Sequence, residues 1–280
     1  MTDADTVQFV VDASGRKLAP SRLPVDSLSL GRGVFETVLF LSGKPVFARE
    51  HEARLRASCA ELAIASDEEA RGIFRVGLVR AAQRPLAAAR GRIAVFAPSH
   101  RGSAAGLIAL EKAGPAPVSV SLMISDARRS SDEPLYRHKT VNYLANLLLR
   151  EDARRCGYDD AVILDTDGNV AEASVANMFL RVGGGLVTPK AGPVLPGIVR
   201  AWVLENAGGA GAFVEERDVP SSALDTCDFA FATNSIIGLV PVSRILTRNL
   251  LPASEVSWFQ RLSKAYRQVL DSASSGAPAP

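Results

Sequence analysis

Short apolar runs bounded by turn residues occur along the first part of the chain, mixed with segments of helical spacing, and the runs predict strands. The run at 34–41 is followed by Ser42-Gly43-Lys44-Pro45, a turn composition, and by a short return strand at 45–47, which together predict a hairpin. The other strands expected here lie at 7–11, 92–96 and 106–111.

Helical spacing occurs between these strands. The apolar positions Leu55, Cys59 and Leu62 predict a helix over 50–62. A second helix is expected to begin after Ser66, because serine caps free backbone amides and the acidic residues that follow suit the positive end of a helix.

Strand and helix alternate in the second part of the chain. We expect strands at 118–124, 160–164, 178–182 and 229–233, and helices at 142–156, 197–207 and 252–272. A polar loop is expected at 125–134, and Gly183-Gly184-Gly185 is most simply a hairpin turn. The solvated side chains of Arg128 and Arg129 would lie on that loop, where a carboxylate of the substrate is the alternative partner.

These patterns predict an α/β (α+β) chain of two domains. A small N-terminal α/β domain is expected at 1–113 and a larger domain at 135–271. An interdomain linker and loop at 114–134 would join them, and the tail at 272–280 has a disordered composition.

Composition narrows the class of protein. At 280 residues, 47% hydrophobic, 22% charged and with a net charge of +2, the chain resembles ordinary globular proteins. It has no basic stripe with aromatic residues, so nucleic acid is not an expected partner, and no apolar run is long enough to span a membrane. The acidic N-terminus argues against a signal peptide, and three isolated cysteines suit a reducing cytoplasm. Neither cysteines nor histidines have metal-ligand spacing, so no metal is expected.

Lys139 and Glu172 are the two groups that indicate chemistry. A lone lysine is usually a solvated charge, and an acid before an apolar strand is as often an exposed edge residue. Lys139, however, follows the polar loop where a helix is about to begin. A lysine that bonds to an aldehyde and then moves protons needs such a fixed, partly desolvated place.

Two small turns and one arginine complete the pattern. The backbone amides of Ile198 and Val199 open a predicted helix, and free amides there bind phosphate. Ser235 follows a buried strand, and Arg54 adds a charged fork, although a surface helix arginine is its simplest interpretation. An amine, a carboxylate and anion-binding turns are the parts that hold pyridoxal 5′-phosphate (PLP). The sequence has no GxSxG, HExxH or Walker A pattern, and Gly31-Arg32-Gly33 lacks the third glycine of a dinucleotide fingerprint.

From Gly31 to Val242 these segments together resemble the class IV aminotransferase family, the fold-type IV PLP enzymes. The resemblance implies a small N-terminal α/β domain, a larger barrel-like domain, PLP between them, and a homodimer. It implies that Lys139 forms the Schiff base and that Glu172 faces the pyridine nitrogen. The remaining cofactor contacts that it implies are Arg54, Ile198, Val199, Ser235 and Ile236 at the phosphate and Tyr143 at the phenolic oxygen.

Within this family the chain most resembles the 4-amino-4-deoxychorismate lyases, which yield 4-aminobenzoate and pyruvate. Thr37 in Phe35-Glu36-Thr37 and the run 233–242 carry that likeness, and Thr37 is a candidate for substrate contact or proton transfer. Tyr143 departs from lyases with arginine at that position. The alternative is a branched-chain or D-amino acid transaminase that uses 2-oxoglutarate. A catalytically silent PLP carrier is a third hypothesis.

Overall fold

The computed structural model describes residues 6–84, 86–98, 102–192 and 194–275. The chain forms two compact units. We call Met1–Gly114, His138–Asn142 and Val269–Pro280 the N-terminal unit, and Pro115–Arg137 with Tyr143–Gln268 the C-terminal unit. The acidic residues 1–5, His100 and the tail residues 276–280 lie outside the described part of the chain.

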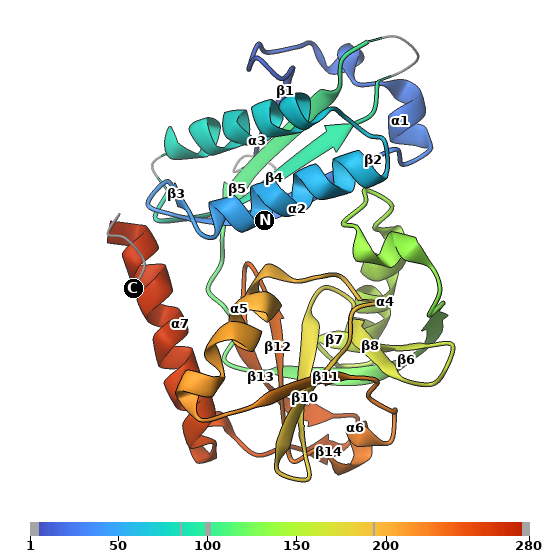
Figure 1. Ribbon diagram of the computed structural model, residues 1–280, viewed down its shortest axis with the longest axis vertical. Coiled ribbons are helices and arrows are strands. Elements are labelled where there is room, and N and C mark those ends of the chain that lie inside the picture. Colours follow the sequence, from blue (N-terminus) through green and yellow to red (C-terminus); the bar gives the residue numbers. More distant parts are fainter. Residues whose placement is uncertain (1–5, 85, 99–101, 193, 276–280) are drawn as a thin grey trace. The chain divides into compact units, whose positions relative to one another are not determined.

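An antiparallel sheet forms the centre of the N-terminal unit, and α2 (Ala48–Glu61) and α3 (Asp67–Ala82) cover one of its faces (Figure 1). Fully buried Phe40, Phe74 and Ile93 belong to the core between sheet and helices. The short helix α1 (Val25–Ser29) precedes β2 (Gly33–Leu41). Within the described residues the strand order is β1 (Val7–Val11), β5 (Ala105–Lys112), β4 (Ala88–Phe96), β2 (Gly33–Leu41) and β3 (Lys44–Pro45).

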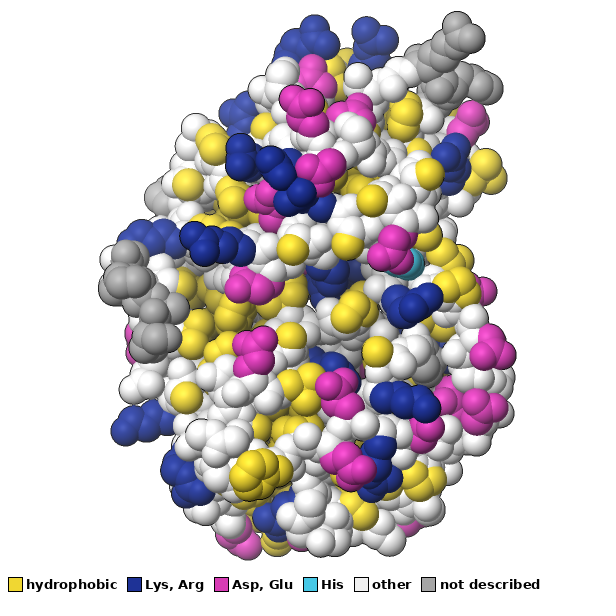
Figure 2. Space-filling view, viewed as in Figure 1, with side chains coloured by type: hydrophobic (Ala, Val, Ile, Leu, Met, Phe, Trp, Pro, Cys, Tyr) yellow, Lys and Arg dark blue, Asp and Glu magenta, His cyan; other side chains and the backbone are white. Residues whose placement is uncertain are grey.

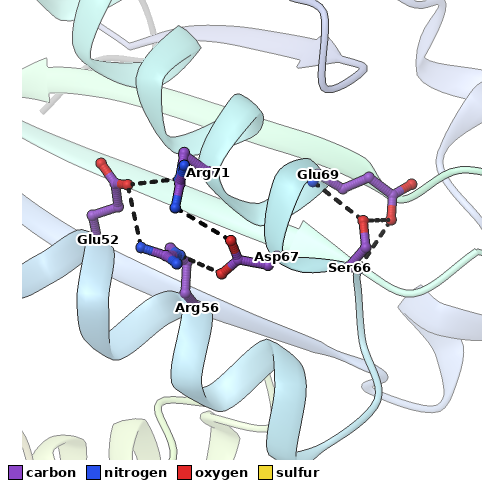
Figure 3. A network of polar contacts seen from close by, with 6 residues as sticks. All are labelled: Glu52, Arg56, Ser66, Asp67, Glu69 and Arg71. Carbon is purple, nitrogen blue, oxygen red and sulfur yellow. Dashed lines mark hydrogen bonds and ion pairs between the residues drawn. The ribbon is translucent and has the colours of Figure 1, made fainter.

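The predicted start of α3 is confirmed as a capping box. The backbone N–H of Glu69 donates to Ser66 Oγ at 3.3 Å, and the backbone N–H of Ser66 donates to Glu69 Oε2 at 3.0 Å. Nearby, Arg56 donates to Asp67 at 2.5 Å in a network that ties α2 to α3 (Figure 3). Solvent screens these exposed charges, so the network adds little to the stability that the buried face provides.

A strongly curved sheet forms the C-terminal unit (Figure 1). Its two edges approach each other: the N–H of Val170 donates to the carbonyl of Val219 at 2.7 Å, and that of Ser221 to the carbonyl of Gly168 at 3.0 Å. In the described residues its order is β11 (Val214–Arg217), β10 (Gly185–Pro189), β9 (Asn177–Val182), β12 (Phe229–Asn234), β13 (Gly238–Ile245), β6 (Val120–Arg129), β7 (Asp160–Asp165) and β8 (Val170–Ala173), with β14 (Arg248–Asn249) on β13.

Two apolar clusters lie on this sheet. One contains Leu122, Val162 and Met178 with α6 (Ala223–Thr226). The other, with stacked Phe179 and Phe231 rings 4.7 Å apart, packs against α5 (Ile198–Asn206) and α7 (Ser257–Ser275). The remaining helix, α4 (Leu144–Arg155), packs on β7. The two-domain fold with a barrel-like second domain is therefore confirmed.

The surface carries both charges. Figure 2 shows Lys and Arg side chains interspersed with Asp and Glu on the visible face, in keeping with the net charge of +2. In the described residues no helix is long and apolar enough to cross a membrane.

The polar loop expected at 125–134 is wrong in its first half, because β6 continues to Arg129. Arg128 and Arg129 pair with Leu164 and Asp165 of β7 after a register shift, so backbone pairing overrides the polar composition. Arg129 is consequently buried, contrary to the solvated side chain expected there.

Two boundaries also differ from the expectation. Residues 138–142, expected in the large domain, belong to the N-terminal unit because their backbone pairs with β2. Residues 272–275 of the expected disordered tail are helical, since α7 runs to Ser275 and Lys44 Nζ donates to the Ser274 carbonyl at 3.1 Å.

Candidate active site

Lys139 is held by its backbone against β2. The N–H of Phe35 donates to the Lys139 carbonyl at 2.8 Å, and the N–H of Val141 donates to the Gly33 carbonyl at 3.0 Å. The Lys139 amine lies over the Phe35 ring, 4.6 Å from its centre. The lysine is thus half-buried at a fixed place on the sheet edge, where the ring excludes part of its water.

Side chains on either side of Lys139 anchor it further. His138 Nδ1 lies 3.0 Å from Ser58 Oγ, and its Nε2 lies 3.4 Å from a carboxylate oxygen of Glu61. Asn142 Nδ2 donates to the Gly31 carbonyl at 3.2 Å. A Cβ on Gly31, whose φ is +68°, would lie 1.7 Å from Asn142 Oδ1, so this close approach requires glycine.

Arg54 is fixed by a buried carboxylate on β2. Its Nε and Nη2 donate to Glu36 Oε1 and Oε2 at 2.8 and 2.7 Å, and His51 Nδ1 lies 2.7 Å from Oε2. Burial raises the pKa of Glu36, but the Arg54 charge and the hydrogen bonds outweigh it and lower that pKa to about 2. The simplest interpretation of Arg54, a surface helix arginine, is therefore wrong.

Thr37 and Glu36 point to opposite faces of β2, because side chains alternate along a strand. Thr37 pairs with Arg92 of β4, so these two side chains share the face that carries Phe35. Arg92 is exposed, and its guanidinium carbon lies 5.8 Å from the centre of the Phe35 ring. Two cationic side chains, Lys139 and Arg92, therefore lie near the Phe35 ring.

In the C-terminal unit, Glu172 on β8 is buried, so the interpretation of an exposed edge acid is wrong. Arg129 Nη1 donates to its Oε1 at 2.5 Å. Asn177 Nδ2 and the Leu195 N–H donate to Oε2 at 3.0 and 3.2 Å. Three donors therefore favour the ionised carboxylate at this position. Arg129 also stacks on Tyr136, with its guanidinium carbon 4.6 Å from the ring centre.

The predicted anion-binding turns lie beside Glu172. Gly197 is the N-cap of α5 and has no side-chain cap, so the amides of Ile198 and Val199 open the helix as expected. Thr233 pairs with Asn177, which places Ser235 just beyond that pair. The hydroxyl of Thr233 is buried without a hydrogen-bond partner among the described residues.

The Ile236 amide already has a hydrogen-bond partner within its own turn. Its N–H and that of Ile237 both donate to Asn234 Oδ1 at 2.9 Å. A phosphate contact at Ile236 would therefore share or replace this bond.

Tyr143 precedes α4 in the C-terminal unit. Burial, and then the negative charge of Glu172, raise its pKa to about 12. The phenol consequently keeps its proton at neutral pH and remains a hydrogen-bond donor.

The structure brings Lys139, Thr37 and Arg54 together in one unit and Tyr143, Glu172 and both turns in the other. Sequence reasoning missed three polar residues near them, Glu36, Arg92 and Asn177, and it placed Arg129 on a solvated loop instead of beside Glu172. Strand alternation gives a signal for Arg92, two residues after Arg90 in an otherwise apolar strand. The roles of Glu36 and Asn177 depend on partners 18 residues away in each case, a separation that local patterns do not detect.

Comparison with known proteins gives a consistent family. A family model described as amino-transferase class IV matches residues 33–245. The chain is 30% identical over 269 residues to branched-chain-amino-acid aminotransferase-like protein 2 of Arabidopsis thaliana, covering 89% of this chain and 47% of that protein. It is 31% identical over 119 residues to aminodeoxychorismate lyase of Bacillus subtilis, covering 42% and 41%. The chain spans about half the length of the curated relatives it matches.

Solved structures agree on the fold. A branched-chain aminotransferase of Thermoproteus uzoniensis superposes with a TM-score of 0.81 at 26% identity, covering 94% of both chains. A Legionella pneumophila protein provisionally assigned as a 4-amino-4-deoxychorismate lyase gives a TM-score of 0.77 at 25% identity, covering 88% of this chain and 96% of that one. A Brucella abortus aminotransferase, solved with PLP, gives 0.77 at 21% identity, covering 91% and 98%.

Proposed function

Because the chain belongs to the class IV aminotransferase family, we propose that it is a PLP-dependent enzyme that converts 4-amino-4-deoxychorismate to 4-aminobenzoate and pyruvate. The observation that carries this proposal is the face of the N-terminal unit with the Lys139 amine, Thr37 and Arg92 around Phe35. It combines a base, a hydroxyl and a cation, which suits an anionic cyclic amine.

The residues fit PLP by the chemistry of their donors. Glu172 is a buried carboxylate whose hydrogen-bond donors favour the ionised form, which a partner for a protonated ring nitrogen needs. The uncapped start of α5 suits a phosphate, as does the Thr233 hydroxyl, which has no hydrogen-bond partner within the described chain. Arg54 provides a charged fork with fixed orientation. Tyr143, which keeps its proton, suits a phenolate oxygen.

When bound, PLP supplies an electron-accepting ring that stabilises negative charge on the substrate carbon. Lys139 would hold the cofactor and, once displaced by the substrate amine, remove the proton from the amine-bearing carbon. Glu172 would keep the ring nitrogen protonated throughout. Arg92 would bind a substrate carboxylate. Thr37 would assist the proton transfer that accompanies the release of pyruvate.

An amino acid transaminase is the second candidate, because the chain aligns over 269 residues with a branched-chain-amino-acid aminotransferase-like protein. Lys139 would then move the proton between the substrate and cofactor carbons. This candidate needs a keto acid such as 2-oxoglutarate as acceptor, whereas the lyase does not.

The test is incubation of the PLP-loaded protein with 4-amino-4-deoxychorismate and no keto acid. We expect 4-aminobenzoate in large molar excess over enzyme. No product from protein that retains its bound-cofactor absorbance would overturn the lyase, and turnover with amino acid donors plus 2-oxoglutarate would then establish the transaminase. The resemblance to this family implies a homodimer, which we propose for this chain as well and which light scattering tests.

A further inference from the structure

Asn177 lies between the two parts of the C-terminal unit to which the proposed function assigns the two ends of PLP. It opens β9, pairs with Thr233 of β12, and its side chain is buried. Its single amide nitrogen donates both to Glu172 Oε2 at 3.0 Å and to the Leu195 carbonyl at 2.9 Å. One side chain thus bonds the carboxylate and the segment that leads into α5.

The contact between Glu172 and that segment is closed by a second bond. The N–H of Leu195 donates to Glu172 Oε2 at 3.2 Å, the same oxygen that accepts from Asn177. Glu172, Asn177 and Leu195 therefore form a ring of three hydrogen bonds, which allows each group little freedom to move relative to the others.

The oxygen of the Asn177 amide sets the position of the α5 N-terminus. A Cβ on Gly197 would lie 1.8 Å from Asn177 Oδ1, so the helix cap rests directly on the amide. Gly197 has φ −70° and ψ 137°, a conformation open to any residue. The glycine is consequently required for space beside Asn177, not for its backbone angles.

Resting on the proposed function, we propose that Asn177 is a positioning residue that fixes the separation between the carboxylate for the ring nitrogen and the helix start for the phosphate. It acts through Glu172 and α5. Aspartate has nearly the same shape as asparagine but has no N–H to donate, and it would place a second negative charge next to Glu172. Asn177→Asp therefore keeps the space filled while it removes the hydrogen bonds that position Glu172 and α5.

The first experiment titrates wild type, Asn177→Asp and Asn177→Ala with PLP and with pyridoxal, which lacks the phosphate. The matched control is Asn206→Asp, because Asn206 Nδ2 also donates to a backbone carbonyl, that of Trp202 at 2.8 Å, but at the far end of α5. We expect Asn177→Asp to weaken PLP binding by at least about tenfold and to reduce the preference for PLP over pyridoxal, whereas the control changes either by less than about twofold.

The second experiment follows the absorbance of the bound cofactor as the pH is changed. A purely structural role of Asn177 would leave the midpoint of this titration unchanged. In Asn177→Asp the added negative charge favours protonated forms, so the spectral midpoint should rise by at least about half a pH unit. Gly197→Ala should weaken PLP binding in the wild-type background and do so less in Asn177→Ala, where the clash is absent. Non-additivity of that pair supports direct contact.

An unchanged midpoint with an unchanged ratio of PLP to pyridoxal affinity, accompanied only by a lower melting temperature, would overturn the proposal. Additive effects of Gly197→Ala and Asn177→Ala would also contradict it. Wild type that binds PLP but makes no 4-aminobenzoate would refute the lyase and leave the role of Asn177 standing. Wild type that binds no PLP would refute both.

Discussion

The two units each bury one glutamate, and the two carboxylates have different surroundings. Glu36 is 1% exposed and meets two side chains able to carry positive charge, His51 and Arg54. Glu172 is 7% exposed and meets one cation, Arg129, and two neutral N–H donors. The former arrangement orients an arginine, and the latter surrounds a carboxylate near a helix start with donors that favour its ionised form. Under the proposed function the first carboxylate positions another group, whereas the second would itself contact the cofactor.

The largest expected effect on turnover is at the base, Lys139, and not at either buried carboxylate. Lys139→Ala should reduce turnover by at least about 10⁴-fold, because both the covalent attachment and the proton transfer depend on this amine. Glu36 and Glu172 would remain intact. Initial rates of 4-aminobenzoate release measure it, and full turnover by the variant would refute the mechanism.

Glu172→Gln should lower kcat by about 10²-fold or more at saturating cofactor, since an amide does not keep a ring nitrogen protonated. The variant should fold with reduced stability, because the single amide oxygen of glutamine can accept from Arg129 or from Asn177 and Leu195, but not from both sides. Stopped-flow absorbance and circular dichroism check the two expectations. An unaltered kcat would mean that Glu172 is structural, like Glu36.

Glu36→Gln should affect stability and cofactor affinity more than kcat, unlike Glu172→Gln. Removing the charge leaves Arg54 partly buried without its partner, which costs about 3–5 kcal/mol of unfolding free energy. PLP affinity should fall more than kcat at saturating cofactor, because Arg54 loses its orientation. Urea unfolding and cofactor titration measure these, and an unchanged free energy of unfolding would contradict the role assigned to the pair.

Lowering the pH tests the contribution of Glu36 to stability reversibly, without a substitution. The pKa of Glu36 is lowered from 4.5 to about 2 in the folded chain. Its contribution to stability is therefore fully present above pH 4.5 and is lost as the pH falls towards 2, on the order of 3 kcal/mol in total. Unfolding free energies of wild type between pH 5.5 and 3 should fall more steeply than those of Glu36→Gln, and parallel curves would exclude this source.

The smallest expected effect is on stability, at the start of α3, which has no proposed role in the reaction. Ser66→Ala removes the capping box of α3 and should cost about 1 kcal/mol. Ser222→Ala is the control, since Ser222 precedes α6 without a side-chain cap bond. Thermal unfolding compares them, and equal melting temperatures for both variants would contradict the role of the cap.

The sequence by itself determined the local elements and the family. Strands at 7–11 and 34–41 and the start of α3 follow from residue spacing and capping, which act over a few positions. The order of Lys139, Glu172 and the two turns sufficed for the family, which the match over 33–245 confirms. The individual roles of Lys139, Thr37, Tyr143 and the phosphate residues stay predictions.

Only the tertiary structure decided which residues support that chemistry. Backbone pairing with β2 assigns Lys139 to the N-terminal unit, and pairing with β7 turns a polar loop into a strand that buries Arg129. Asn177 bonds Glu172 five residues away and Leu195 eighteen residues away. Such partners meet because the sheet brings distant segments together, and the cost of leaving a buried polar group unpaired then selects the bonds.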